Sequence, residues 1–251
     1  MILDIDMGNT RIKWLLKDRD RVVERGAFAA ESMTAFFASL NDSDYEPQRV
    51  RVASVRPSLH EVFDRLCLQY WQLQPEYAIV SRQYKRIVNA YQDVSQMGVD
   101  RWMGIIAASQ LIDSPCLVVS AGSAMTVDLL DNDAGHLGGF IVPGGQLMRQ
   151  SLYRDTDQVK LAQIDYDIQP ALGKNTRQAV SSGIVLMQMG LLQQSLALLV
   201  ELVDAADVVV IVSGGDGQRL CEILSNGATI PALAGVIYEP DLVFKGLSLA
   251  L

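Results

Sequence analysis

The sequence is poor in side chains that bind metals through sulfur or imidazole. Its 251 residues include three cysteines and two histidines, and no two cysteines have the CxxC spacing. A structural zinc site needs about four such ligands at short spacings, so none is expected. Cys67, Cys116 and Cys221 lie far apart, and two of them lie in apolar runs. We expect buried free thiols in a reducing compartment.

Positive charge is also scarce. The chain has 21 Lys and Arg against 29 Asp and Glu, which gives a formal net charge of −8. Surfaces that bind nucleic acids or anionic membranes need clustered cations, so this composition argues against both. A phosphorylated ligand is still compatible with it, because phosphate recognition is local and uses backbone N–H groups with one or two cations.

Long uninterrupted apolar runs are missing as well. Val208–Val212 is short and Ile184–Val203 contains polar residues, so neither predicts a membrane span. The opening MILDIDMGNT has acidic residues where a secretory signal would have basic ones followed by an apolar segment. We therefore expect a cytoplasmic protein without a membrane partner.

What the chain does have is enough apolar material for a substantial core. Hydrophobic residues make up 49% of the sequence and charged residues 20%, which is typical of a soluble globular protein. The length allows one large domain or two of about 120 residues each.

Similar segments begin the two halves of the chain. ILDIDMGNTRIKWLL and LVVSAGSAMTVDLL align at an offset of 114 residues, and both have apolar residues, a glycine-containing turn and apolar residues again. The aligned pairs are Leu3 with Leu117, Gly8 with Gly122, Leu15 with Leu129, Leu16 with Leu130, and Asp6 with Ser120. This pattern predicts a repeated strand–turn–strand hairpin.

The rest of the chain predicts helices and strands in both halves. In the first half, helices are expected at MTAFFASL and Leu59–Trp71, strands at VRVASV and YAIV, and a later helix with Asp100 near its start. In the second half, GGFIVPG predicts a strand, a long helix begins near Asn175, and VVVIVSGGD predicts a buried strand before the helix GQRLCEIL. We place the boundary near Ser114–Pro115, giving domains 1–114 and 115–251.

Three glycine-containing or acidic motifs have both a plain and a chemical interpretation. Asp6–Thr10 is compatible with an ordinary hairpin turn, and also with a loop whose backbone and side chains bind phosphate. Gly214–Gly215 is compatible with a common strand–helix turn or with close approach of a nucleotide. Asp100 is compatible with a helix N-cap beside a surface Arg101, or with a general base beside an anion-binding arginine. Taken singly, none of the three motifs decides between its plain and its chemical interpretation.

Taken together and in order, the motifs resemble one family. The segments DMGNTRIKW, NAY, GVDRW, GSAMTVDLL, GGFIVPG, GKNT and SGG resemble the type III pantothenate kinases, from Asp6 to about Asp216. The resemblance implies an α/β fold made of two duplicated ribonuclease-H-like domains of the actin-like ATPase superfamily, with mixed sheets flanked by helices. That agrees with the repeat.

The resemblance also implies roles for individual residues. Asp100 would be the general base that takes the proton from the pantothenate hydroxyl. ATP and its phosphates would contact Asp6, Met7, Gly8, Asn9, Thr10, Arg11, Ile12, Lys13, Gly122, Ser123, Gly214 and Gly215. Pantothenate would contact Tyr91, Gly98, Val99, Asp100, Arg101 and Thr176, with Arg101 facing its carboxylate.

The implied reaction phosphorylates pantothenate with ATP to give 4′-phosphopantothenate, the first step of coenzyme A biosynthesis. Mg²⁺ would accompany ATP, and Asp6 would bind it through water. Catalysis would consist mainly of positioning and of charge neutralisation. Family members are homodimers whose pocket is completed by the neighbouring chain, so Thr176 would act across the interface.

Ser120 departs from the family pattern. The family's second loop normally reads Asp-x-Gly-Thr-Ala, and its Asp binds a monovalent cation, K⁺ or NH₄⁺. Here Ser123 keeps the hydroxyl of Thr, but Ser120 lacks the charge of Asp. The chain is then an active kinase that does not need K⁺, an active kinase whose cation site uses other oxygens, or an impaired regulatory relative. Because Asp6 and Asp100 are retained, we expect activity with weak or absent K⁺ dependence.

A kinase of the same superfamily with a different substrate is a further alternative. Tyr91, Gly98–Arg101 and Thr176 argue against it, because they match the pantothenate pocket and not the general ATP-binding residues.

Overall fold

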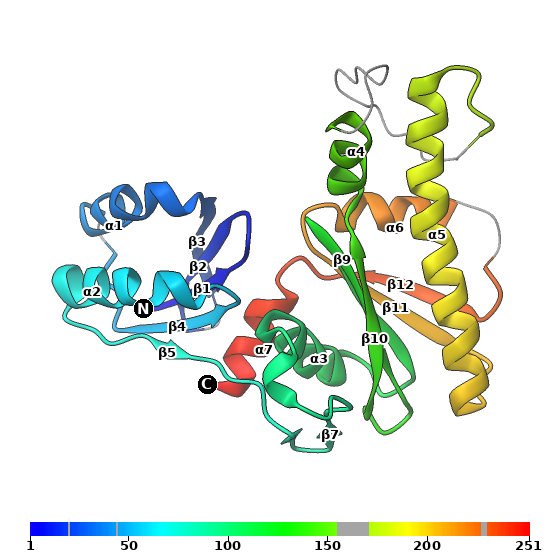
Figure 1. The fold of residues 1–251 in the computed structure, drawn as a ribbon. Coiled ribbons are helices and arrows are strands. Elements are labelled where there is room, and N and C mark those ends of the chain that lie inside the picture. Colours follow the sequence, from blue (N-terminus) through cyan, green and yellow to red (C-terminus); the bar gives the residue numbers. More distant parts are fainter. Residues whose placement is uncertain (20, 44, 155–170, 227–229) are drawn as a thin grey trace. The chain divides into compact units, whose positions relative to one another are not determined.

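The computed structural model describes residues 1–251 except 20, 44, 155–170 and 227–229 (Figure 1). Its residues form two compact units, each described here by itself. The first unit comprises Met1–Arg82, Tyr91–Ala107 and Asp241–Leu251; the second comprises Gln83–Ala90 and Ala108–Pro240. These units are not the segments 1–114 and 115–251, because each takes residues from the other segment. The boundary near Ser114–Pro115 between two duplicated domains therefore stays a prediction.

The first unit is built on a five-stranded mixed sheet in the order β3-β2-β1-β4-β5. Strands β1, β2 and β3 are antiparallel neighbours, while β4 and β5 run parallel to β1. Its elements are β1 (Ile2–Met7), β2 (Ile12–Asp18), β3 (Arg21–Phe28), α1 (Met33–Asn41), β4 (Arg49–Ser54), α2 (His60–Trp71), β5 (Glu76–Tyr77) and α7 (Leu242–Ala250), with short 3₁₀ helices at Ala30–Ser32, Pro57–Leu59 and Val94–Gln96. Helix α3 (Val99–Leu111) begins in this unit.

The second unit repeats this topology. Its five-stranded sheet has the order β10-β9-β8-β11-β12, with the same sequence of antiparallel and parallel neighbours. Its elements are β6 (Gln83–Tyr84), β7 (Ile87–Val88), β8 (Cys116–Ala121), β9 (Ala124–Leu130), β10 (His136–Pro143), α4 (Gly145–Arg154), α5 (Thr176–Val203), β11 (Val208–Ser213), α6 (Gly217–Asn226) and β12 (Leu233–Tyr238). Two sheets with one topology confirm the predicted α/β fold with mixed, helix-flanked sheets.

The hairpin repeat is confirmed in its first strand and wrong by one residue in its second. Strands β1 and β8 are offset by 114 residues, and Gly8 and Gly122 each follow them directly. However, Leu3 pairs with Leu16, whereas Leu117 pairs with Leu129. The second turn is one residue shorter, so the second strands are related by 113 residues. The constant offset that aligned Leu16 with Leu130 is therefore incorrect.

Each sheet packs one face against two helices. In the first unit, Leu3, Ile5 and Val52 of the sheet pack with Phe37 of α1 and Phe63 of α2, all fully buried. The predicted helices MTAFFASL and Leu59–Trp71 correspond to α1 and α2, because their apolar residues recur at helical spacing.

In the second unit, β8, β9 and β11 pack against α5 and α6. Two of the three cysteines, Cys67 and Cys116, are buried free thiols as predicted, while Cys221 is partly exposed. Burial raises the pKa of the Cys116 thiol to about 12, so that group stays protonated at neutral pH.

Helix α5 corrects the expectation about long apolar segments. Among the described residues it is the one helix long and apolar enough to cross a membrane, with 28 residues and a mean hydropathy of 1.6 in its most apolar 18-residue window. Of that window, 44% is buried inside the protein, where Leu192, Leu196 and Leu199 join the second core. A core helix passes the same test, so the finding is weak evidence for a membrane span.

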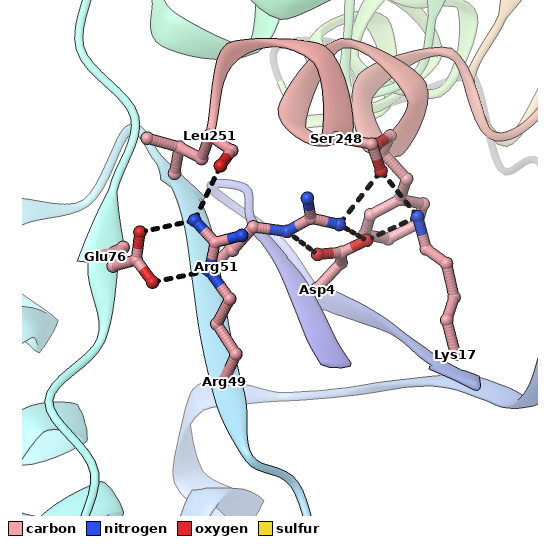
Figure 2. Close-up of polar contacts among 8 residues, drawn as sticks. Asp4, Lys17, Arg49, Arg51, Glu76, Ser248 and Leu251 are labelled. Carbon is pink, nitrogen blue, oxygen red and sulfur yellow. Dashed lines mark hydrogen bonds and ion pairs between the residues drawn. The ribbon is translucent and has the colours of Figure 1, made fainter. Parts of the chain in front are cut away.

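The opposite face of the first sheet has a buried ion cluster under α7 (Figure 2). Asp4 is fully buried and accepts two hydrogen bonds from Arg51, at 2.7 and 2.9 Å. Lys17 Nζ lies 2.7 Å from the Asp4 carboxylate. Ser248 of α7 accepts hydrogen bonds from both Arg51 and Lys17. The cluster fastens the C-terminal helix to strands β1 and β4, far away in sequence.

Helix α7 in turn packs closely against α3. A Cβ added to Gly246 would lie 1.9 Å from the carbonyl oxygen of Met103, so only glycine allows this approach. The first sheet thus positions α7, and α7 packs against the helix that begins at Val99.

Candidate functional site

The first hairpin turn presents a carboxylate and a lysine side by side. Asp6 is the penultimate residue of β1 and pairs across the sheet with Lys13 of β2. Gly8 begins the turn, where an added Cβ would come within 3.2 Å of the carbonyl oxygen of Arg11. Met7 and Ile12 have fully buried side chains, so only their backbone atoms are available to a ligand.

Asp6 is electrostatically coupled to Asp100. Loss of water around the Asp6 carboxyl raises its pKa from 3.8 to about 6; Lys13 opposes this rise, and the negative charge of Asp100 adds to it. The structure therefore brings together two carboxylates and one lysine that lie far apart in the sequence. A cation bound at Asp6 would oppose the repulsion between the two carboxylates.

Asp100 lies in the first turn of α3, as predicted, but it is not the N-cap. The helix begins at Val99, and the Asp100 carboxylate accepts a hydrogen bond of 2.8 Å from the backbone N–H of Arg101. A Cβ on Gly98 would lie 2.5 Å from Asp100 Oδ1, so the side chain folds back over a position that glycine keeps open. The positive end of the helix favours the ionised form of such a carboxylate.

Arg101 and Tyr91 form a pair next to this carboxylate. Arg101 is 6% exposed, donates a hydrogen bond of 2.7 Å to the Tyr91 hydroxyl and lies over the Tyr91 ring. Arg82 holds the segment in place by donating hydrogen bonds to the carbonyl oxygens of Tyr91 and Gln92. Val99 is buried in the helix and contributes no exposed side chain. The predicted grouping of Tyr91 with Gly98–Arg101 is thus present in one unit.

The first unit fits a magnesium ion accompanying a phosphorylated ligand. Mg²⁺ prefers carboxylate oxygens and keeps several waters, and the Asp6 carboxyl, whose pKa is raised by burial and by Asp100, is a hard oxygen donor of this kind.

The second hairpin turn is enclosed by two glycines from other elements. A Cβ on Gly144 would lie 1.9 Å from the Gly122 carbonyl oxygen, and one on Gly214 would lie 2.2 Å from the Ala121 carbonyl oxygen. Gly214 also has a φ of +94°, which favours glycine. The Gly144 N–H donates to the Ser123 carbonyl oxygen at 2.9 Å.

Two helices begin beside this turn. Helix α4 starts at Gly145, directly after Gly144, and α6 starts at Gly217, shortly after Gly214–Gly215. Helix N-termini offer backbone N–H groups and a positive dipole end, the usual elements of an anion site. The predicted residues Gly122, Ser123, Gly214 and Gly215 are therefore brought together in the second unit.

Ser120 lies in a row of hydroxyl side chains. It pairs with Thr126 on β9 and with Ser213 on β11, so the three point to the same face of the sheet. The Ser213 hydroxyl donates to the carbonyl oxygen of Val119. Neutral hydroxyls are weaker cation ligands than a carboxylate, so this donor set fits a monovalent cation poorly.

Thr176 belongs to a different unit from the other predicted substrate contacts. It is the exposed first residue of α5, in the second unit, whereas Tyr91 and Arg101 belong to the first. The Asn175 side chain caps this helix by accepting from the Gln178 N–H at 2.9 Å, which confirms the predicted helix start.

Comparison of the sequence with known families identifies its relatives. The sequence profile of the type III pantothenate kinases matches residues 2–197. The chain belongs to the type III pantothenate kinase family.

Relatives from this family match over the full length. The type III pantothenate kinase of Pseudomonas aeruginosa is 35% identical over 260 residues, covering 100% of this chain and 98% of the relative. That of Cellvibrio japonicus is 33% identical over 252 residues, covering 99% and 96%. The predicted family and enzyme class are thereby confirmed at the level of type III pantothenate kinases.

Solved structures share the fold at lower sequence identity. A protein described as a Baf family transcriptional activator from Campylobacter jejuni has a TM-score of 0.59 at 23% identity, covering 99% of this chain and 96% of that one. A protein described as a 2-dehydro-3-deoxygalactonokinase from Sinorhizobium meliloti has a TM-score of 0.57 at 13% identity, covering 100% and 98%. These likenesses concern the fold alone.

Several residues that surround the two hairpin turns had no role predicted from the sequence. Gly144 was assigned to a strand and turn within the segment GGFIVPG, and its packing on the second hairpin was not foreseen. Arg82 holds the Tyr91 segment, and Arg56 donates to the Asn9 carbonyl oxygen across 47 residues of sequence. Contacts of this kind depend on which strands are neighbours, which no local motif encodes. In the described parts of the chain, no group of three or more His, Cys, Asp or Glu residues is placed to hold a metal ion by itself.

Proposed function

We propose that this chain phosphorylates pantothenate with ATP to give 4′-phosphopantothenate. The observation that carries the proposal is that Asp6 pairs across the sheet with Lys13 and is influenced by the charge of Asp100, in the same unit as the Arg101–Tyr91 pair. This arrangement supports a role for Asp100 as the base and for the first turn as the phosphate loop. Family membership supports the choice of ATP and pantothenate as substrates.

In this reaction the pantothenate hydroxyl oxygen forms a bond to the terminal phosphorus of ATP. The bond between that phosphorus and the oxygen of ADP breaks, and the hydroxyl proton passes to the Asp100 carboxylate. Lys13 and the N–H groups of the first turn neutralise and orient the phosphates, while Arg101 binds the substrate carboxylate. Asp6 would hold Mg²⁺ through water, and the ion would supply charge neutralisation to the phosphate groups.

The test is to incubate the protein with ATP, Mg²⁺ and pantothenate and to detect phosphopantothenate by mass spectrometry. Asp100→Asn should bind pantothenate normally and lose activity by about 10²- to 10⁴-fold, because general-base catalysis contributes roughly that much. Asp42→Asn, an exposed carboxylate at the end of α1, is the matched control. Near-normal turnover in Asp100→Asn would remove that residue from the role of base.

A catalytically impaired regulatory or binding homologue is the second candidate. Its support is the hydroxyl row at Ser120, which lacks the carboxylate expected at the second hairpin. This candidate predicts that pantothenate or nucleotide binds, measured by calorimetry, while no phosphopantothenate forms. Turnover by the wild-type protein rules it out.

We also propose that turnover does not require K⁺ or NH₄⁺. The support is the same row of Ser120, Thr126 and Ser213, whose neutral oxygens give weak cation binding. Activity should be nearly equal in sodium-only and potassium buffers. A strong K⁺ requirement would contradict the proposal.

A homodimer is proposed from the surface of the second unit. Large apolar side chains are exposed on its helices and edge strand: Leu186 and Met187 on α5, Tyr153 on α4 and Ile141 on β10 are 55–65% exposed. Exposed apolar side chains of this size are typical of an interface. Light scattering should give twice the chain mass, and Met187→Glu should lower it. A monomeric mass for the wild type would contradict the proposal.

A further inference from the structure

Arg56 lies against the first phosphate loop. Strand β4 runs parallel to β1, and Met7 pairs with Ser54, so the two strands end together at one edge of the sheet. The chain beyond β4 follows the loop, because the Val55 N–H donates to the Met7 carbonyl oxygen at 3.2 Å. Arg56 Nη1 then donates to the Asn9 carbonyl oxygen at 3.4 Å. Ligands of open sheets of this kind bind where parallel strands end.

The backbone at Arg56 is held in place. Its N–H donates to the Ser54 hydroxyl at 3.1 Å, and that hydroxyl also lies 2.8 Å from His60 Nε2. Pro57 follows directly and restricts the conformations open to Arg56. A half-buried arginine on a fixed backbone places its guanidinium group at a defined point beside the loop.

The Arg56 guanidinium group has a charge and hydrogen-bond donors that the contact with Asn9 does not use. A guanidinium carries five N–H donors, and the bond to Asn9 uses one of them on a neutral oxygen. In the described ranges, none of the ion pairs formed by acidic side chains involves Arg56. By contrast Arg49 and Arg51, which lie on the preceding strand β4, are each paired with a carboxylate.

The same edge of the sheet carries the carboxylates of Asp6 and Asp100 as well as the charge of Lys13. Asp6 and Asp100 are close enough to influence each other, and Val55 connects the two regions, since a Cβ on Gly98 would lie 3.8 Å from Val55 Cγ1. A nucleoside triphosphate would add several negative charges to this place. A planar guanidinium is suited to bind two oxygens of one phosphate group.

We propose that Arg56 binds the terminal phosphate group of the nucleoside triphosphate, in addition to supporting the loop through Asn9. This deepens the proposed function and rests on it, since it assigns the phosphate donor to the first hairpin. Arg56 keeps its proton throughout and forms no covalent bond. The contact between Arg56 and the terminal phosphate group would be absent when only a nucleoside diphosphate is bound.

The test compares binding of ADP with that of adenylyl imidodiphosphate, a non-hydrolysable triphosphate, both with Mg²⁺, by calorimetry. Arg56→Gln should weaken triphosphate binding by about 10- to 100-fold and change ADP binding by less than about threefold. Arg56→Lys keeps a charge but not the two-donor geometry and should lie between wild type and Arg56→Gln. Arg65→Gln, an exposed arginine on α2, is the control and should bind both nucleotides normally.

A purely structural role for Arg56 would give a different result. If the side chain only supports the loop, Arg56→Gln weakens both nucleotides equally, and Arg56→Lys behaves in the same way; that result overturns the proposal. Unchanged binding of the triphosphate overturns it as well. Both comparisons are independent of turnover, so a wild-type protein that binds nucleotides but makes no phosphopantothenate would reject the proposed function and still decide the role of Arg56.

Discussion

The two hairpins have the same strand pairing and carry different chemistry at the same place. In the first, Asp6 on the central strand pairs with Lys13. In the second, Ser120 occupies the equivalent place between Thr126 and Ser213. One row is charged and the other carries only hydroxyls. The topology of the repeat is therefore preserved by apolar residues facing the core, while the residues on the opposite face at the ends of β1 and β8 differ.

The opposite ends of the two sheets differ in the same way. Sheet pairing makes Val118 the counterpart of Asp4, Ile211 that of Arg51 and Leu130 that of Lys17. An ion cluster in the first unit thus corresponds to three apolar residues in the second. Replacing a buried ion cluster by packed apolar residues is often neutral for stability. The equivalent positions of the two sheets are therefore occupied in two different ways, by ion pairs in the first unit and by apolar side chains in the second.

The largest effect is expected from breaking the ion cluster. Asp4→Asn leaves Arg51 and Lys17 without their buried counter-charge and should lower the free energy of unfolding by about 3–5 kcal/mol. Its counterpart Val118→Ala should cost roughly 2 kcal/mol. Urea unfolding measures both.

A triple variant sharpens this comparison. Asp4→Val with Arg51→Ile and Lys17→Leu copies the residues of the second unit, and it should recover most of the stability lost in Asp4→Asn. If the triple variant is as unstable as the single one, the apolar solution of the second unit does not fit under α7.

The second largest effect concerns the pH dependence of the free energy of unfolding, to which Asp6 of the first hairpin should contribute and Ser120 of the second should not. The pKa of Asp6 is raised in the folded protein from 3.8 to about 6, so the folded state binds that proton more tightly than the unfolded state. The resulting stabilisation is complete below pH 3.8 and is lost as the pH rises through about 6. The difference corresponds to roughly 3 kcal/mol.

Urea unfolding between pH 4.5 and 7.5 in EDTA checks this expectation. The wild type should lose stability relative to Asp6→Asn as the pH rises, whereas Ser120→Ala should differ from the wild type by a constant amount. A pH-independent difference between wild type and Asp6→Asn would show that Asp6 titrates normally.

Activity should respond unequally to substitution of the two equivalent residues. Asp6→Asn removes a charge from the proposed metal and phosphate site and should lower kcat/KM for ATP by about 100-fold. Ser120→Ala removes only a hydroxyl and should change it by less than about threefold. Equal losses in steady-state assays would mean that the second hairpin contributes as much as the first.

The smallest effect is expected from a substitution that introduces a negative charge into the second hairpin. Ser120→Asp should make turnover severalfold faster in potassium than in sodium buffer, because a carboxylate binds a cation better than a hydroxyl does. The wild type is the control and should show little difference. The same small ratio in both proteins would place the cation site elsewhere.

Much of this site follows from the sequence, because its residues lie in local patterns. Gly8 and Gly122 marked the turns, and Asp100 was placed near a helix start. The one-residue shift between the second strands could not be seen, since consecutive leucines align at either offset. Strand β3 was missed because it is an exposed edge strand without an apolar face.

Other features depend on tertiary structure alone. The contact of Arg56 with Asn9 arises because β4 pairs with β1, and the position of Gly144 matters because β10 ends beside the second turn. The family resemblance covered Gly144 within the segment GGFIVPG but implied no role for it, and it implied none for Arg56.

Helix α7 has a consequence for the order of folding. The first unit contains both the first strand and the last eleven residues of this sequence, Asp241–Leu251, which cover Asp4 and Arg51. Helix α7 follows the whole second unit in this sequence, so during synthesis from the N-terminus the charged face of the first sheet stays uncovered until the second unit has been made. The unit whose first strand is made first is therefore completed after the other one, and the charged side chains of Asp4, Arg51 and Lys17 remain hydrated until α7 covers them.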